Sequence, residues 1–387
     1  MHRRGMANDR YLQRVRDLCG LALRRLPTMV DPRSGLTVFR TDGPDLVPAG
    51  SSVRYTAMTA LGLERAADAG LSSTLEVPKL HAALERVLGE VDDSGDLGLV
   101  LWSAARKNRP LAERAVALLM GFGELTKRRG GDAFHSTELA WVVTGLAEAL
   151  AAGVGDEPRV RERLGEAWDL LLANRGPSGL MGFARERGAP SLRGRVRREL
   201  GFFDAQVYTI VAALRRFEIL GDGEALEVAR SIGTQLLRHQ GERGQWAWHY
   251  NARTGAVVDQ YPVYSVHQDG MAPMALLPLE RLGGVQVEAA VARGVEWLFS
   301  QNELGVPMVN LARDTIWRSI RRRGPASRIV FPLKAASLAG IDSPALGTVA
   351  AVPALLEIDR ELRPYHLGWC LYAFAELAAG SSERRAA

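Results

Sequence analysis

Apolar residues recur along this chain with the 3.6-residue period of an α-helix, in paired segments joined by short links. The first helix of each pair is amphipathic, and the second is more apolar on all sides, which is typical of a helix packed on two faces. The pattern therefore predicts six helical hairpins. The expected outer helices are Arg10–Arg25, Leu75–Val91, Pro110–Lys127, Pro158–Asn174, Glu224–Gln240 and Val287–Gln301, and the expected inner helices are Val53–Ala69, Leu97–Arg106, Thr137–Ala152, Phe203–Leu220, Val266–Arg281 and Tyr365–Ala379.

The links carry glycine and, in most cases, an aromatic residue. They span Ser34–Phe39, Asp93–Leu99, Gly130–His135, Ser178–Phe183, Arg243–Trp248 and Glu303–Asn310, and the first and fourth are close copies. One hairpin cannot bury its apolar face alone, so repeated hairpins stack, and six can close into a ring. We predict an all-α (α/α)6 toroid over residues 1–380 with short β-hairpin-like links, followed by a frayed tail at 381–387.

In such a ring the links and the N-terminal ends of the inner helices share one face. The free N–H groups and the positive dipole ends there favour anions. A helix cap is an equally good explanation of any one polar residue at these ends, but capping does not require Glu, Gln or His. When the inner helices are aligned, the polar residues in or beside the first turn are Arg54, Glu138, Asp204, Gln206, His267, Gln268, Asp269 and His366.

One segment, Trp246–Gly270, is unusually rich in aromatic and neutral polar side chains. Aromatic faces beside hydrogen-bonding groups suit a sugar ring, or a prenyl chain with a polar head, whereas packing of the link against the ring is the simpler alternative. Ala252–Gly255 is expected to turn between two short strands. The candidates here are Trp246, Trp248, His249, Tyr250, Tyr261, Tyr264, His267, Gln268 and Asp269.

The charge balance does not point to nucleic acid. The net charge is +5, and only four of the 49 basic residues are Lys, so the Arg bias is as well explained by a GC-rich genome. Two segments, Arg185–Arg198 and Arg313–Arg328, each hold six Arg and one acid. Arg binds carboxylate and phosphate in a forked geometry, although charge runs are usually solvated surface. The residues proposed to capture an anion are Arg195, Arg197, Arg198, Arg321, Arg322 and Arg323.

Several classes of protein are not expected. No apolar run reaches the roughly 18 residues of a membrane span, and Met1–Arg14 lacks the apolar core of a secretory signal. Cys19 and Cys370 lack a metal-like spacing and are expected to be buried thiols in a reducing compartment. We therefore expect a cytoplasmic protein without metal, cofactor, nucleic-acid partner or membrane span.

The fifth hairpin carries a family motif. Gln240, Gly244 and Trp246 match the QxxxGxW repeat of squalene cyclases and related terpenoid cyclases, and Trp297–Gln301 opens a decayed copy. The chain thus resembles the α/α-toroid superfamily, which also includes the protein prenyltransferase β subunits. The cyclase acid motif Asp-x-Asp-Asp and the prenyltransferase zinc ligands are not present, which argues against both activities.

The chain is also similar in fold and composition to six-hairpin glycosidases, polysaccharide lyases and uronyl epimerases, and to toroid proteins of bacterial exopolysaccharide biosynthesis. This resemblance implies a protein that acts on, or binds, an anionic carbohydrate or a lipid-linked diphosphate sugar, in contact with polysaccharide assembly machinery. A terpenoid-cyclase-like or prenyl-diphosphate-binding protein and a non-catalytic scaffold are the alternatives.

Two chemistries compete if the protein is an enzyme. Hydrolysis needs two carboxyl groups across the glycosidic bond, for which the candidates are Glu138, Asp204 and Asp269. Elimination or epimerisation needs a base and an acid beside an acidified C–H bond, with Arg neutralising the carboxylate. The candidates for that chemistry are His249, Tyr261, Tyr264, His267 and His366, with Arg54, Gln206, Trp246, Trp248, Tyr250 and Gln268 as binding residues.

Overall fold

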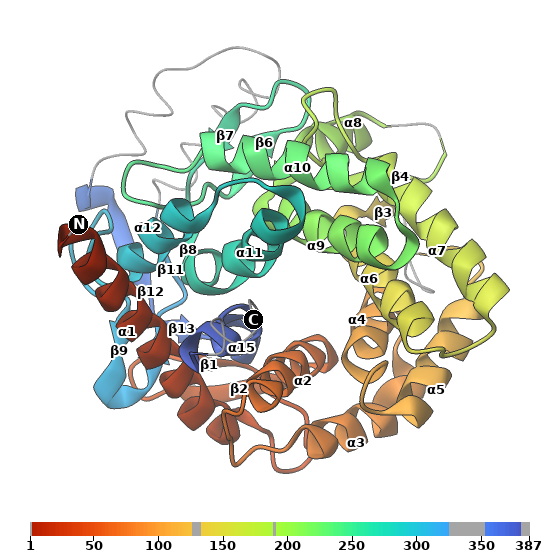
Figure 1. Ribbon diagram of the computed structural model, residues 1–387, viewed down its shortest axis with the longest axis horizontal. Coiled ribbons are helices and arrows are strands. Elements are labelled where there is room, and N and C mark those ends of the chain that lie inside the picture. Colours follow the sequence, from red (N-terminus) through yellow and green to blue (C-terminus); the bar gives the residue numbers. More distant parts are fainter. Residues whose placement is uncertain (1, 126–132, 189–190, 325–352, 381–387) are drawn as a thin grey trace.

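Two concentric rings of helices surround one axis in the computed structural model, which describes residues 2–125, 133–188, 191–324 and 353–380 (Figure 1). The predicted (α/α)6 toroid is confirmed. The outer ring consists of α1 (His2–Arg25), α3 (Val77–Val87), α5 (Arg109–Met120), α7 (Glu157–Leu172), α10 (Gly223–Arg238) and α12 (Glu288–Leu298). The inner ring consists of α2 (Val53–Asp68), α4 (Ser94–Ala104), α6 (Ser136–Ala151), α9 (Phe203–Leu220), the π-turn η3 (His267–Met271) with α11 (Ala272–Gly283), and α15 (Pro364–Ala378).

The ring closes where the last inner helix, α15, packs against α1 and α2. The backbones of α2 and α15 touch at Gly62 and Gly368. A Cβ atom added at Gly62 would lie 2.1 Å from the carbonyl oxygen of Gly368. Glycine is therefore required at this contact, because backbone atoms on two packed helices cannot move aside.

We expect Gly62→Ala to lower the free energy of unfolding by at least about 1–3 kcal/mol, because the added methyl group overpacks the closure of the ring. Gly165 is the matched control, since it also lies inside a helix, α7, but has no atom near its added Cβ. Gly165→Ala should stabilise the protein by roughly 0.5–1 kcal/mol. Urea unfolding of both variants tests the prediction, and equal shifts would contradict it.

Two inner helices begin differently from the prediction. α4 begins at Ser94 rather than Leu97, because the Asp93 side chain caps it by accepting a hydrogen bond from the Gly95 N–H at 2.8 Å. Most of the predicted link Asp93–Leu99 is therefore helical. The fifth inner helix begins with the π-turn η3 and continues as α11.

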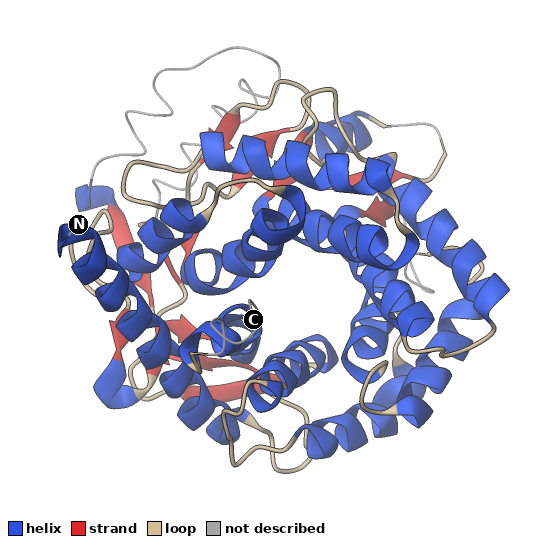
Figure 2. Cartoon of the chain, in the orientation of Figure 1, coloured by secondary structure: helices blue, strands red, loops and turns tan. Residues whose placement is uncertain are grey.

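Small antiparallel sheets connect neighbouring links (Figure 2). The predicted turn at Ala252–Gly255 is confirmed between β6 (His249–Asn251) and β7 (Val257–Asp259), and Gly255 has a φ of +80°. A short helix, α8 (Leu192–Glu199), lies between β4 (Ala184–Glu186) and β5 (Leu200–Phe202). The 3-10 turns are η1 (Leu26–Met29), η2 (Leu88–Glu90), η4 (Leu311–Arg313) and η5 (Pro353–Leu355). The sheets in the described residues are β13 (Glu361–Leu362), β1 (Val38–Asp42) and β2 (Val47–Ser51); β3 (Ala133–His135) and β4 (Ala184–Glu186); β5 (Leu200–Phe202), β6 (His249–Asn251) and β7 (Val257–Asp259); β12 (Leu356–Asp359), β11 (Ser319–Arg322) and β8 (Val263–Tyr264); and β9 (Val309–Asn310) and β10 (Thr315–Ile316).

Some of the predicted segments fall outside the described residues. Residues 130–132 of the third link and the tail 381–387 lie outside the described residues. Both cysteines are buried and neither forms a disulfide. No helix among the described residues has the length and apolar character needed to cross a membrane.

Aromatic side chains fill the middle of the ring. The Trp369 Nε1–H donates to the Tyr208 hydroxyl at 2.8 Å, and the Trp369 ring lies 5.5 Å from the rings of Trp102 and Tyr372. Tyr208 lines a cavity on one side of this layer, whereas Trp102 and Tyr372 line a smaller cavity on the other. The aromatic layer thus separates the two ends of the ring.

Candidate active site

A cavity of about 200 Å³ opens where the inner helices begin. Its walls come from the N-terminal halves of α2, α6, α9 and α15, from η3, and from the links. Arg54, Asp204, Trp248, Tyr264 and His267, all predicted site residues, are brought together here. The complete lining is Arg54, Tyr55, Met58, Trp141, Asp204, Tyr208, Trp248, Tyr264, His267, Met271, Arg318, Arg363 and Tyr365.

Asp204 is the carboxyl group of this lining. It lies in the first turn of α9, where its Oδ1 accepts a hydrogen bond from the Ala205 N–H at 2.9 Å. Burial raises the pKa of Asp204 to about 6. The hydrogen bond from Ala205 lowers the pKa in part, and repulsion from Glu138 raises it further. An acid with such a pKa can hold a proton near neutral pH and still release it, which is the requirement for general acid catalysis.

Arg54 gathers three carboxylates beside the cavity. Its Nε donates to Asp96 Oδ1 at 2.6 Å, and its Nη2 lies 3.8 Å from Asp93 Oδ2 and 3.9 Å from Glu138 Oε1. The guanidinium also covers the Trp141 ring at 4.6 Å. The first-turn alignment of Arg54 and Glu138 thus corresponds to real proximity, although Glu138 lies behind Arg54 rather than in the cavity lining.

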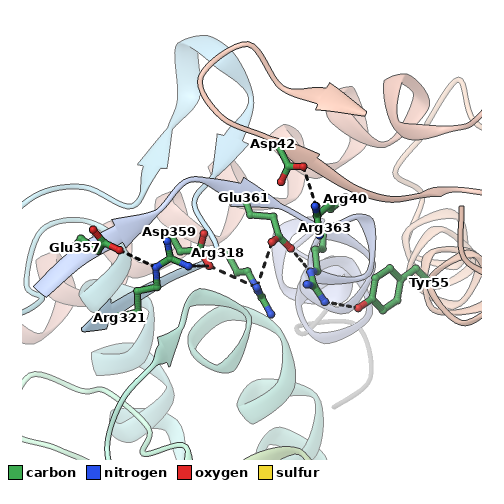
Figure 3. A network of polar contacts seen from close by, with 9 residues as sticks. All are labelled: Arg40, Asp42, Tyr55, Arg318, Arg321, Glu357, Asp359, Glu361 and Arg363. Atoms are coloured by element: carbon green, nitrogen blue, oxygen red, sulfur yellow. Dashed lines mark hydrogen bonds and ion pairs between the residues drawn. The ribbon is translucent and has the colours of Figure 1, made fainter. Parts of the chain in front are cut away.

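Arg318 and Arg363 form a second cationic wall, which sequence reasoning did not assign to the site (Figure 3). Arg318 lies 5.1 Å above the Tyr264 ring and donates to Glu361 at 3.2 Å. Arg363, the residue before α15, donates to Glu361 and to the Tyr55 hydroxyl, the latter at 2.7 Å. The sequence contained a weak signal for each, because Arg318 lies in the second basic segment and Arg363 directly precedes an inner helix.

His267 belongs to the aromatic wall of the cavity. Its ring stacks on Trp248 at 5.2 Å with an interplanar angle of 24°, and it lies 5.1 Å from Tyr264. Burial lowers the pKa of His267 well below its ordinary value, and repulsion from His366 lowers it further. A histidine held neutral in this way does not supply a proton at neutral pH.

Other predicted first-turn residues hold the scaffold together. Asp269 Oδ1 and His366 Nε2 lie 2.7 Å apart in the buried interior, outside the cavity lining. Gln206 is fully buried, where it accepts from the Met181 N–H and donates to the Met181 carbonyl, each at 2.7 Å. Gln268 is also buried and donates to the Tyr264 carbonyl at 3.1 Å. These contacts fasten links to helices.

The remaining aromatic candidates also lie outside the cavity lining. Trp246 and Tyr250 are completely buried, and Tyr261 is buried beneath the Arg322 guanidinium at 5.1 Å. His249 lies on β6, and its ring is 5.0 Å from that of Phe202. For these residues the structure agrees with the packing alternative more than with contact to a ligand.

The two arginine clusters differ in their surroundings. In the second, Arg322 makes a buried two-point ion pair with Asp259 at 2.7 and 2.9 Å, Arg321 pairs with Glu357 at 3.0 Å, and Arg323 donates to the Leu356 carbonyl at 2.8 Å. Arg321 and Arg323 thus bond to residues of β12 in the same sheet, whereas Arg322 ties β11 to β7 of the neighbouring sheet. In the first cluster Arg195 and Arg198 are exposed on α8 and Arg197 is half-buried. Arg328 lies outside the described residues.

No protein-family model matches this chain, and no curated protein resembles it significantly in sequence. Solved structures match its fold. The fold is that of the six-hairpin glycosidases. An unsaturated glucuronyl hydrolase specific for heparin is similar with a TM-score of 0.62 at 15% identity, over 97% of this chain and 98% of that one. The unsaturated glucuronyl hydrolase of Bacillus sp. GL1, responsible for the degradation of glycosaminoglycan, gives 0.60 at 16% identity, over 95% and 96%.

A third similar structure is a glycosyl hydrolase family 88 protein from Bacteroides vulgatus, with a TM-score of 0.58 at 10% identity, over 96% of this chain and 98% of that one. In this glycosidase fold the QxxxGxW motif has a structural explanation. The Gln240 side chain donates to the carbonyls of Gly244 and Ala290, both at 2.8 Å, and so ties the fifth link to α12. The motif therefore reflects the hairpin architecture.

Among the described residues, no cluster of three or more His, Cys, Asp or Glu is arranged to hold a metal.

Proposed function

We propose that this protein is a glycoside hydrolase that removes a terminal uronic-acid residue from an oligosaccharide. The observation that carries the proposal is one cavity that combines an acid with a pKa near 6, Asp204, with the arginines Arg318 and Arg363. The cavity of about 200 Å³ is smaller than the roughly 300–1,000 Å³ of sites for larger ligands. It suits a single sugar ring at the end of a chain.

Each wall of the cavity has a part in the proposed reaction. Arg318 and Arg363 bind the sugar carboxylate through paired N–H donors, and Trp248 and Tyr264 pack against the ring. Asp204 donates its proton to the glycosidic oxygen, the bond between that oxygen and the sugar carbon breaks, and the rest of the chain leaves as an alcohol. A water molecule then bonds through its oxygen to that sugar carbon and returns a proton to Asp204, so that one water is consumed for each linkage cleaved.

An unsaturated glucuronyl residue is the proposed substrate, because two of the similar structures are unsaturated glucuronyl hydrolases. Elimination and epimerisation receive less support. Burial raises the pKa of Tyr264 and lowers that of His267, so the tyrosine stays protonated and the histidine is a weak base. The prenyl-diphosphate and scaffold alternatives are outcomes of the assay below, and a place in surface-polysaccharide production stays a prediction.

The deciding experiment compares three substrates with the purified protein. The protein is incubated separately with an unsaturated glucuronyl disaccharide, with the saturated glucuronide and with the neutral glucoside of the same aglycone. Release of the unsaturated sugar, followed by loss of its ultraviolet absorbance, supports the proposal. Binding without turnover would favour a scaffold, and binding of a prenyl diphosphate in place of all three sugars would favour the cyclase-like alternative.

The pH dependence of this activity should report Asp204. A general acid must be protonated, so the rate is expected to fall as the pH rises through about 6, the raised pKa of that group. An Asp at its ordinary pKa of 3.8 would place the fall about two pH units lower. A profile of kcat against pH between 4 and 9 measures the difference. A kcat that stays unchanged up to pH 8 would contradict the assignment.

A further inference from the structure

We propose that Glu361 is a positioning residue, whose single carboxylate holds both Arg318 and Arg363 in the orientation that binds the sugar carboxylate. This inference rests on the proposed function. Glu361 lies on β13, where it is 8% exposed and pairs in register with Asp42 of β1. The strand pairing therefore fixes the position of the Glu361 backbone.

One oxygen of Glu361 serves each arginine (Figure 3). Oε1 accepts from the Arg363 Nε, and Oε2 accepts from the Arg318 Nη1 at 3.2 Å. Both arginines line the cavity, whereas Glu361 does not. Glu361 therefore acts on a ligand through these two arginines and makes no contact of its own.

The two arginines keep donors that the protein does not use. A guanidinium has five N–H groups. Arg318 bonds to Asp359 and Glu361 through its Nη1, and its Nη2 makes no hydrogen bond among the described residues. Arg363 spends its Nε on Glu361 and its Nη1 on Tyr55. Unspent donors on two guanidinium groups held by one anchor are suited to the two oxygens of a carboxylate.

The eight charged side chains drawn in Figure 3, Glu361 included, balance one another. Arg40, Arg318, Arg321 and Arg363 alternate with Asp42, Glu357, Asp359 and Glu361, so four positive groups meet four negative groups (Figure 3). Such a network offers an anion little net charge. Recognition of a carboxylate must then come from the direction of the free N–H groups, and that direction depends on the shared anchor.

Glu361→Gln separates orientation from charge, because it removes one negative charge from the network but places an amide N–H₂ against one arginine. If the orientation of Arg318 and Arg363 determines substrate binding, the KM for the uronoside rises at least tenfold while the affinity for the neutral glucoside is unchanged. If net charge determines it, the KM falls. Glu357→Gln is the matched control, because it removes the same charge from Arg321, which does not line the cavity. Its KM should stay within twofold of wild type.

Arg363→Lys keeps the test valid if Glu361→Gln folds poorly, since it preserves the charge but loses the Nε contact to Glu361. We expect a comparable rise in KM, and an unchanged KM in Arg363→Lys would overturn the proposal. Failures can be told apart. If the wild-type protein neither binds nor cleaves the uronoside, the proposed function falls; if it does so and Glu361→Gln matches Glu357→Gln, only the role of Glu361 falls.

Discussion

Replacement of Asp204 by Asn is expected to lower kcat by about 10²–10⁴-fold, the usual contribution of a positioned acid. Asn retains an oxygen that can accept the Ala205 N–H, as Asp204 Oδ1 does at 2.9 Å. The amide cannot deliver a proton at any pH. The measurement is release of unsaturated glucuronate from a disaccharide at saturating substrate.

The same variant should be more stable than the wild type at neutral pH. Burial raises the pKa of Asp204 from 3.8 to about 6, so the stability that this group contributes is present below pH 3.8 and is lost as the pH rises through about 6. The charged form above that pH costs up to roughly 3 kcal/mol, from about 1.4 kcal/mol per pKa unit. Asp204→Asn should therefore raise the melting temperature at pH 8 and leave it nearly unchanged at pH 4. A gain in stability with a loss of activity is typical of a catalytic group.

Asp156→Asn is a suitable control for Asp204→Asn. Asp156 caps α7 by accepting a hydrogen bond from the Arg159 N–H at 3.1 Å, and Asn caps helices about as well as Asp. We expect wild-type activity and stability from this control. If Asp204→Asn keeps more than a tenth of the activity, Asp204 is not the acid, and Glu138 and Asp96 become the carboxyl groups to test.

The helices and the ring could be predicted because they depend on local information. The 3.6-residue period marks each helix, and repetition of a hairpin implies stacking and closure. The alignment of first turns also put Arg54 and Glu138 at equivalent positions on one face of the ring, where Arg54 Nη2 and Glu138 Oε1 lie 3.9 Å apart although 84 positions separate them in the sequence. The position of a residue within its helix fixes how far along the ring axis the residue lies. Residues at equivalent positions of the inner helices therefore meet at the same end of the ring.

The direction of each side chain could not be predicted in the same way. Gln206 follows Asp204 by two positions in α9, yet Gln206 turns to the Met181 backbone while Asp204 faces the cavity. Long-range pairing was equally hidden. Arg322 resembles an anion-binding residue in the sequence, but its partner Asp259 comes from a different link and accepts hydrogen bonds from both of its terminal nitrogens. Arg318, which directly precedes β11, lines the cavity although it also bonds to Asp359 and Glu361.

Asp269→Ala is expected to destabilise the protein by about 3–5 kcal/mol, the cost of breaking a buried pair by removing one partner. Asp269 and His366 are almost fully buried, and Oδ1 and Nε2 lie 2.7 Å apart between η3 and α15. The sequence predicts catalytic roles for both. Neither is among the described residues that line the cavity, so we now expect the pair to join the fifth and sixth inner helices.

Thermal unfolding and single-turnover rates, measured on the same sample, separate the two roles. A structural pair predicts a large fall in melting temperature and a rate per folded molecule close to wild type at low temperature, whereas a catalytic Asp269 predicts the reverse. A double-mutant cycle with His366→Leu sharpens the result. When both partners are apolar, no buried polar group is left without its partner, so Asp269→Ala with His366→Leu should cost less than the sum of the two single changes. Strict additivity of the two losses in the free energy of unfolding would show that the contact does not stabilise the packing of the fifth and sixth inner helices.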